Sequence, residues 1–184
     1  MQKSRSFSTK RIVFSAAAIG LATLIADFIK LPSLPFGGSS TLFSMLFVSL
    51  VGYWYGPVVG ISAAIAHGIL QFISNPYAIH PLQVILDYPI AFGMLGLSGF
   101  FSKKKNGLMI GYVVGVFGRF VISSISGLIF FTEYVGNAQG NFAAILESVL
   151  YNISYILPEC IFTVVLLFVP PVKKALIYIK KMAQ

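Results

Sequence analysis

The stretch HPLQVILDYPIAFG, residues 80–93, contains one carboxylate, Asp87, in a run otherwise apolar enough to lie within a membrane. A carboxylate in hydrocarbon costs about 2.5 to 3.5 kcal/mol on insertion scales, so it faces a cavity or a partner and marks a candidate site. Of the 184 residues, 57% are hydrophobic and 10% are charged, and the mean hydropathy is +0.88. An ordinary soluble domain has about 25% charged residues. The sequence therefore predicts an all-α integral membrane protein.

Six apolar segments separated by turn sequences predict a bundle of six transmembrane helices. The segments cover residues about 11–30, 41–55, 57–75, 82–101, 108–131 and 144–169. Because each span needs about 20 mostly apolar residues, the chain has room for about six spans. We therefore expect a single membrane domain over residues 1–184.

The basic residues predict how this bundle is oriented. With six spans, one side of the membrane collects Lys3, Arg5, Lys10, Arg11, Lys103, Lys104, Lys105, Lys173, Lys174, Lys180 and Lys181. The opposite side has only Lys30. The positive-inside rule then predicts that both termini are cytoplasmic. The net charge of +8 follows from this topology, and we expect no nucleic-acid partner.

Three predicted helices each carry a polar stripe near the outer side of the membrane. Steps of four residues place side chains on one helix face. The candidate ligand-binding residues on these stripes are Asp87, Tyr88, Arg119, Ser123, Gly127, Phe131, Glu147, Tyr151 and Asn152. A carboxylate among aromatic rings suits a flat cationic heterocycle. The stripes therefore predict a pocket for a small polar molecule, open to the outside.

Other interpretations of the same residues remain. Polar side chains in membrane helices often only bond to neighbouring helices, and Asp87 with Arg119 could form a structural ion pair. A membrane scaffold or channel is therefore the second hypothesis, and an intramembrane enzyme is the third. The sequence contains no GxSxG, HExxH or GxxxxGK[ST] motif, so we expect no catalytic residues, no metal and no cofactor. His67 and His80 are expected to be hydrogen-bonded structural residues.

Small residues predict the packing surfaces. Gly56 with Gly60 and Gly111 with Gly115 form GxxxG pairs, which permit close approach of helices. The first helix has a wide small face that includes Ala18 and Ala22. We expect this face to dock onto another membrane protein.

Five segments in order resemble one protein family over almost the whole chain. They are AD at 26–27, PFGGSSTLF at 35–43, HPLQVILDYPIAFGMLGLSGFF at 80–101, GRFVISSISGLIFF at 118–131 and SVLYNISYILPE at 148–159. The chain resembles the thiamine-specific substrate-binding (S) components of energy-coupling-factor vitamin transporters, which are ABC-type importers of the bacterial plasma membrane.

The resemblance implies a six-helix S component that captures a vitamin from outside, in a pocket roofed by the loop between the first two helices. It implies that the bundle reorients when Ala18 and Ala22 dock onto a transmembrane coupling subunit, which two cytosolic ATPases accompany. The family's pocket acid and adjacent tyrosine match Asp87 and Tyr88. Its basic residue, glycine and asparagine match Arg119, Gly127 and Asn152.

Three positions differ from the family's usual pattern. Ser123 stands in place of histidine, Phe131 in place of tryptophan and Glu147 in place of tyrosine. Phenylalanine preserves stacking, whereas serine shortens and neutralises a contact. Hydroxymethylpyrimidine and pyridoxine are therefore the alternative ligands to thiamine.

Overall fold

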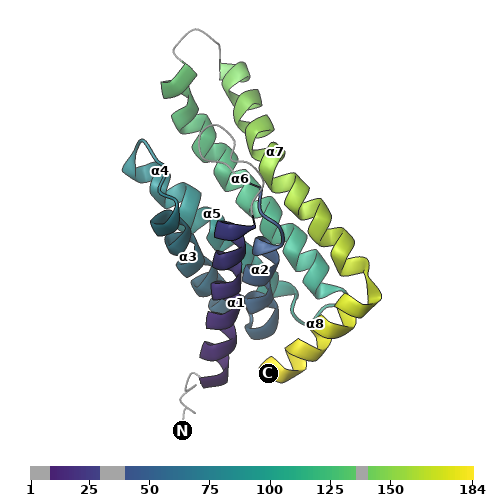
Figure 1. The fold of residues 1–184 in the computed structure, drawn as a ribbon. Helices are drawn as coiled ribbons and strands as arrows, with labels where there is room; N and C mark the ends of the chain where they lie inside the picture. The colour runs from purple at the N-terminus through teal and green to yellow at the C-terminus, as the bar shows by residue number, and fades with distance from the viewer. Residues whose placement is uncertain (1–8, 30–39, 136–140) are drawn as a thin grey trace.

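The computed structural model describes residues 9–29, 40–135 and 141–184, with the backbone alone at 131–135, 141, 143 and 144, and its regular elements are helices (Figure 1). In chain order they are α1 (Thr9–Phe28), α2 (Ser44–Tyr55), α3 (Pro57–Ser74), α4 (Pro81–Ile85), η2 (Leu86–Ile90), α5 (Ala91–Gly93), η3 (Met94–Phe101), α6 (Gly107–Val135), α7 (Asn141–Phe168) and α8 (Pro170–Ala183). The predicted all-α class is confirmed.

Five stretches of the described chain are long and apolar enough to cross a membrane. They are α1, α3, the run Pro81–Phe101, the part Gly107–Phe130 of α6 and the part Ile145–Phe168 of α7. Helix α2 has 12 residues and is therefore about 18 Å long, shorter than the hydrocarbon layer. It is buried along most of its length and lies at the centre of the fold. The structure thus gives five candidate spans, and the sixth stays a prediction.

The run 82–101 is not the single regular helix that we expected. It changes from α-helix to a π-helical turn at Leu86–Ile90, returns briefly to α-helix and ends as a 3-10 helix at Met94–Phe101. Pro89 lies inside the π-helical turn and has no N–H to donate, which disfavours a regular α-helix there. π-Helical turns of this kind are frequent at functional sites.

Close backbone contacts hold this irregular run against its neighbours. A Cβ on Gly96 would clash with the Ile61 backbone of α3, and a Cβ on Gly111 would lie 2.8 Å from Ser98 Cα. The expected close approach at Gly60, Gly111 and Gly115 is confirmed. Gly56 has a different role, because it forms the turn between α2 and α3 with φ at 90° and a Cβ there would meet open space.

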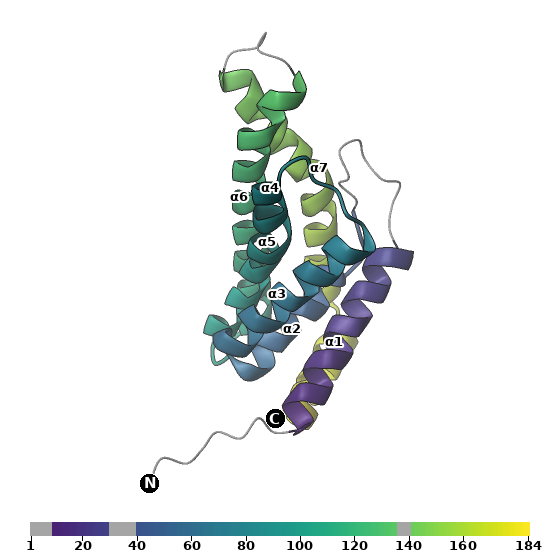
Figure 2. The same cartoon turned by 90° about the vertical axis from the view of Figure 1, so that its left-hand side faces the viewer.

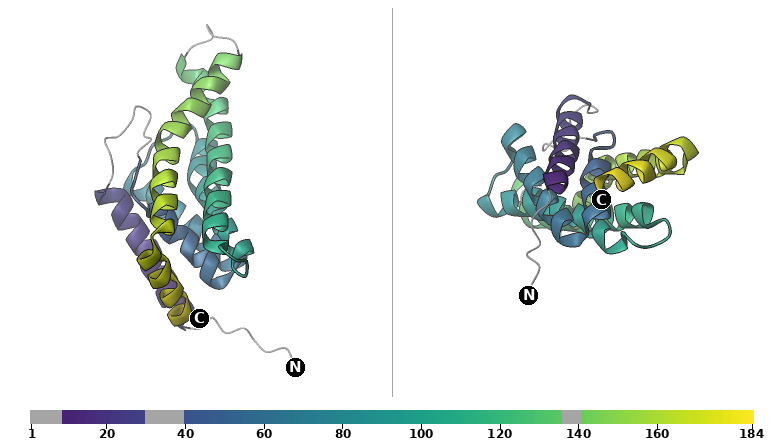
Figure 3. Two further views of the ribbon diagram at one scale, coloured as in Figure 1. Left: turned by 90° about the vertical axis from the view of Figure 1, so that its right-hand side faces the viewer. Right: turned by 90° about the horizontal axis from the view of Figure 1, so that it is seen from below.

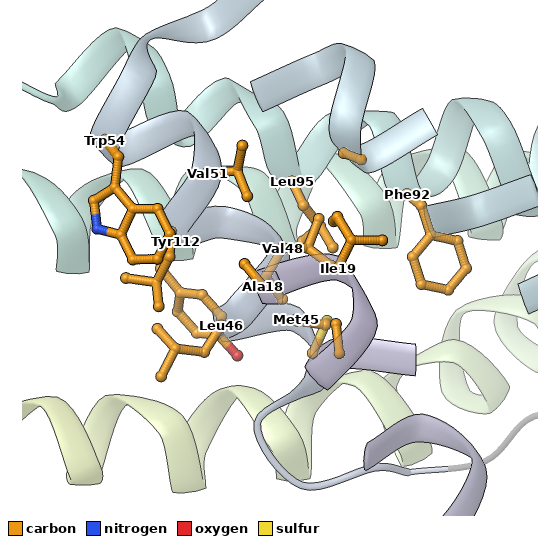
Figure 4. Packing of buried hydrophobic residues seen from close by; sticks show 14 of the residues in the cluster. Ala18, Ile19, Met45, Leu46, Val48, Val51, Trp54, Phe92, Leu95 and Tyr112 are labelled. Carbon is orange, nitrogen blue, oxygen red and sulfur yellow. The ribbon is translucent and has the colours of Figure 1, made fainter. Parts of the chain in front are cut away.

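The hydrophobic core gathers around α2 (Figure 4). Met45 and Val48 of α2 meet Leu95 of η3 there. Ala18 and Ala22 belong to the same core, with 3% and 0% of their surface exposed. Their small side chains let α1 close on α2 and α3 within the chain (Figure 2), and docking of this face onto another membrane protein stays a prediction.

The two ends of the bundle differ. The α6–α7 pair forms one end, and α1 begins and α8 ends at the other (Figures 1 and 3). Helix α8 follows a break at Val169, where the backbone is extended, and it turns away from the direction of α7. This helix was not predicted from the sequence. That the end with α8 faces the cytoplasm stays a prediction.

Candidate ligand-binding site

The π-helical turn presents Asp87 to α6. The half-buried Asp87 carboxyl group faces the side chains of Gln83 and Ser126, with Arg119 in electrostatic range. Gln83 is 8% exposed, and its Oε1 accepts a hydrogen bond of 3.0 Å from the Ile79 N–H. Neither Gln83 nor Ser126 was among the predicted site residues, although the four-residue step from Gln83 to Asp87 is visible in the sequence.

Helix α6 contributes buried polar atoms that have no hydrogen-bond partner among the described residues. Two of them lie near Asp87, namely the hydroxyl oxygen of Ser126, which is 0% exposed, and Nε of Arg119. The Arg119 Cζ lies 4.0 Å from the centre of the Phe92 ring, a cation–π contact. Within the described chain Arg119 acts on Asp87 by Coulombic attraction without an ion pair between them. Since an unpaired buried donor or acceptor costs about 1 to 3 kcal/mol, these atoms are suited to meet a ligand.

We call Asp87, Gln83, Arg119 and Ser126 the polar cluster. Helix α7 closes its other side. Asn152 is 3% exposed, its Nδ2 donates to the Ser148 carbonyl at 2.9 Å, and its Oδ1 accepts from the Tyr155 hydroxyl at 2.6 Å. Tyr155 also faces the buried Ser123 on α6. The Tyr151 ring packs edge-on against Tyr155 at 5.6 Å. Tyr155 was missed, although it continues the four-residue step from Tyr151.

Tyr88 supports the site through its hydroxyl group. That group donates to the Asn75 carbonyl at 3.0 Å and accepts from the Tyr77 N–H at 3.1 Å. The Asn75 side chain in turn donates to Asp27 of α1 at 3.1 Å. Tyr88 therefore fixes the connection before α4, directly beside the carboxylate of Asp87.

Both histidines are hydrogen-bonded, as expected. His67 is 1% exposed, and its Nδ1 pairs with Thr23 Oγ1 of α1 at 3.1 Å. Its ring also packs edge-on against Phe92 at 5.1 Å. His80 accepts from the Leu82 N–H at 3.1 Å and so caps α4, while its ring stacks on Phe130 at 5.5 Å.

For the other predicted site residues, no hydrogen bond or ring contact to the polar cluster is found among the described residues. Glu147 is half-buried on α7, and Gly127 is half-buried on α6. The Phe131 side chain and the loop predicted to roof the pocket lie outside the described part of the chain. The described residues contain no group of three His, Cys, Asp or Glu side chains that could hold a metal.

Glu159 on α7 is an internal cap. It is 2% exposed and accepts hydrogen bonds from Thr41 Oγ1 at 2.6 Å, Ser44 Oγ at 3.1 Å and the Met45 N–H at 2.8 Å. These groups lie at the N-terminus of α2, where backbone N–H groups have no partner within the helix. Glu159 therefore joins α7 to the start of α2.

Together, the apolar spans and the buried polar cluster define a multi-pass membrane protein with polar groups gathered between η2, α6 and α7. The model of the family described as "Thiamine transporter protein (Thia_YuaJ)" matches residues 12–179. The chain belongs to this family, which places it in the bacterial plasma membrane.

Two curated relatives support the same family. The chain is 31% identical over 169 residues to "Thiamine transporter ThiT" of Bacillus subtilis, a match that covers 84% of each chain. It is 34% identical over 94 residues to "Thiamine transporter ThiT" of Lacticaseibacillus paracasei, covering 44% of this chain and 45% of the relative.

A solved structure supports the fold. The structure of ThiT from Listeria monocytogenes superimposes with a TM-score of 0.62 at 19% identity, covering 94% of this chain and 92% of that one. At this identity the likeness concerns the arrangement of the helices alone.

Proposed function

We propose that this chain is the substrate-binding (S) component of an energy-coupling-factor importer and that it binds thiamine in the polar cluster between η2, α6 and α7. The observation that carries the proposal is the position of Asp87, which faces the buried and unpaired hydroxyl of Ser126. The names of the two curated relatives support thiamine as the ligand.

The groups of the cluster match the chemistry of thiamine. Thiamine combines an aminopyrimidine, which donates and accepts hydrogen bonds, with a cationic thiazolium ring. The Asp87 carboxylate can accept from the amino group, and Ser126 and Arg119 Nε offer unpaired polar atoms. Tyr151 and Tyr155 supply aromatic faces on α7, which attract flat and cationic rings. Asn152, held by Ser148 and Tyr155, fixes this wall in place.

Transport would need energy from separate subunits. The sequence has no GxxxxGK[ST] loop to bind nucleotide phosphates, so the chain does not supply the ATPase itself. We infer that a transmembrane coupling subunit and two cytosolic ATPases complete the importer, and that the bundle reorients to release the vitamin. In the orientation that the basic residues predict, the cluster opens to the outside.

Calorimetric titration of the purified, ligand-stripped protein in detergent tests this function. We expect tight binding of thiamine and weaker binding of hydroxymethylpyrimidine and pyridoxine. Asp87→Asn should weaken thiamine binding by at least tenfold, since a hydrogen bond to a charged group contributes about 1.5 to 3 kcal/mol. The matched control is Asp27→Asn, which makes the same chemical change at the end of α1 and keeps an oxygen for Asn75.

Two results would count against the proposal. Folded protein that binds none of the three compounds would favour a membrane scaffold. If Asp87→Asn changed the affinity by less than about 0.5 kcal/mol, below what a charged hydrogen bond supplies, the assigned role of Asp87 would be wrong.

A further inference from the structure

A second feature lies at the opposite end of the bundle, where α8 meets the connection between η3 and α6. We call this region the basic end, and it contains Lys103, Lys104, Lys105, Lys173, Lys174, Lys180 and Lys181. Lys173 Nζ donates to Asn106 Oδ1 at 3.2 Å, and Lys180 Nζ donates to the Ser102 carbonyl at 2.7 Å. The sequence has no acid between residues 88 and 132 or after 159, so nearby carboxylates from these segments do not neutralise the lysines.

A groove with a volume of about 170 Å³ opens between α8, the start of α6 and the end of α7. Its lining is mostly apolar and includes Leu108, Met109 and Leu176. Asn106 and Lys173 supply polar groups to the same groove. A site of this composition suits a molecule that has an anionic group attached to an apolar chain.

Helix α8 has the character of a helix that lies in the membrane interface. Leu176, Ile179 and Ala183 pack against the core. The exposed surface combines Lys173, Lys174 and Lys181 with Tyr178 and Met182, of which the last two are 64% and 41% exposed. An amphipathic helix with both cationic and apolar exposed side chains binds at the boundary of headgroups and acyl chains, most strongly with anionic lipids.

We propose that the groove binds an anionic phospholipid of the bilayer. The lipid phosphate meets Lys173 and Asn106, and an acyl chain covers Leu108 and Leu176. Charge complementarity selects the occupant, because basic groups between membrane helices on the cytoplasmic side attract anionic headgroups. The apolar lining favours a lipid over a soluble phosphate. This site is separate from the polar cluster around Asp87 and does not depend on the proposed function.

Native mass spectrometry of the full-length protein in detergent tests the proposal, with phosphatidylglycerol and phosphatidylcholine of the same acyl chains as probes. We expect stronger retention of phosphatidylglycerol. Lys173→Gln should weaken its retention about fivefold, since one lysine at an anionic surface contributes about 1 kcal/mol. Lys174→Gln is the matched control, because it removes the same charge from α8 outside the groove and should stay near wild type. An unchanged unfolding temperature would show that both variants are folded.

Several outcomes would overturn the proposal. Equal retention of the two lipids would exclude selection of the anionic headgroup. Equal losses in Lys173→Gln and Lys174→Gln would assign the effect to diffuse surface charge. Full displacement of phosphatidylglycerol by glycerol phosphate at equal concentration would make a soluble phosphate the occupant. Lys173-dependent binding of an acidic peptide, without lipid retention, would assign the groove to a protein partner.

Discussion

The carboxylate of Glu159 on α7 accepts a hydrogen bond of 2.8 Å from the backbone N–H of Met45, in the first turn of α2. A side chain of one helix thus caps another that is distant in sequence. The negative charge also complements the positive end of the helix dipole at the N-terminus of α2. Because α2 lies at the centre of the core, this contact links the packing of the fold to the helix that carries Asn152.

Glu159→Ala should destabilise the protein by about 2 to 3 kcal/mol, because it removes a helix cap and leaves the buried Met45 N–H without its acceptor. Thermal unfolding in detergent measures the change. Glu147→Ala removes a half-buried carboxylate from the same helix and should have a small effect. Equal unfolding temperatures for the two variants would contradict the capping role.

Ser126→Ala should weaken thiamine binding about fivefold and leave the ligand-free protein as stable as wild type or more so. The reason is that the Ser126 hydroxyl is buried without a partner among the described residues, while a typical hydrogen bond to a ligand contributes about 1 kcal/mol. Ser98→Ala is the contrast, because Ser98 is equally buried and its hydroxyl donates to the Ser49 carbonyl at 2.7 Å. Ser98→Ala should lower the stability of the protein and leave its affinity for thiamine unchanged. The opposite pattern in calorimetry and thermal unfolding would place Ser126 among the structural residues.

Tyr88→Phe should keep the packing against Phe72 and lose the hydrogen bonds to residues 75 and 77. We expect a loss of about 1 kcal/mol in stability and faster hydrogen exchange in the connection before α4. Tyr178→Phe, at an exposed position of α8, is the control. Unchanged exchange at residues 75–80 in Tyr88→Phe would show that the hydroxyl does not hold this connection.

Gly60→Ala should cost about 1 to 3 kcal/mol, since its Cβ would lie 2.5 Å from Gly52 Cα and the helices would have to separate. Gly20→Ala is the matched control, because a Cβ there meets nothing within 4 Å. It should be neutral or stabilise α1 by up to about 1 kcal/mol through helix propensity. Similar unfolding temperatures for the two variants would contradict close packing of α3 on α2.

Periodicity in the sequence predicted that polar side chains of three helices come together. Because residues four apart share a helix face, the stripes that contain Asp87, Ser123 and Asn152 converge in the structure on Tyr155 and Ser126. Periodicity does not show whether a small face packs within the chain or against a partner, so the burial of Ala18 and Ala22 inside the bundle was not predicted. The cap at Glu159 depends on a contact across 114 residues of sequence, which no local pattern contains.

The irregular helix 81–101 was also beyond local prediction. Pro89 indicates a break, but the 3-10 form of Met94–Phe101 is accompanied by tight backbone packing of Gly96 and Gly99 on the start of α3. Helix α8 was overlooked because its 14 residues are too few for a span and begin with two prolines.

The π-helical turn at Leu86–Ile90 has an evolutionary consequence. Such a turn has one residue more than an α-helical turn, so deleting one residue would regularise the helix and rotate everything beyond it by about 100°. Gly96 and Gly99 would then leave α3, while Asp87 would stay near α6. An insertion or deletion at this point cannot alter binding without also altering assembly of the bundle. Descendants of this chain can therefore change ligand preference by substitution here, but not by changing the length of the turn.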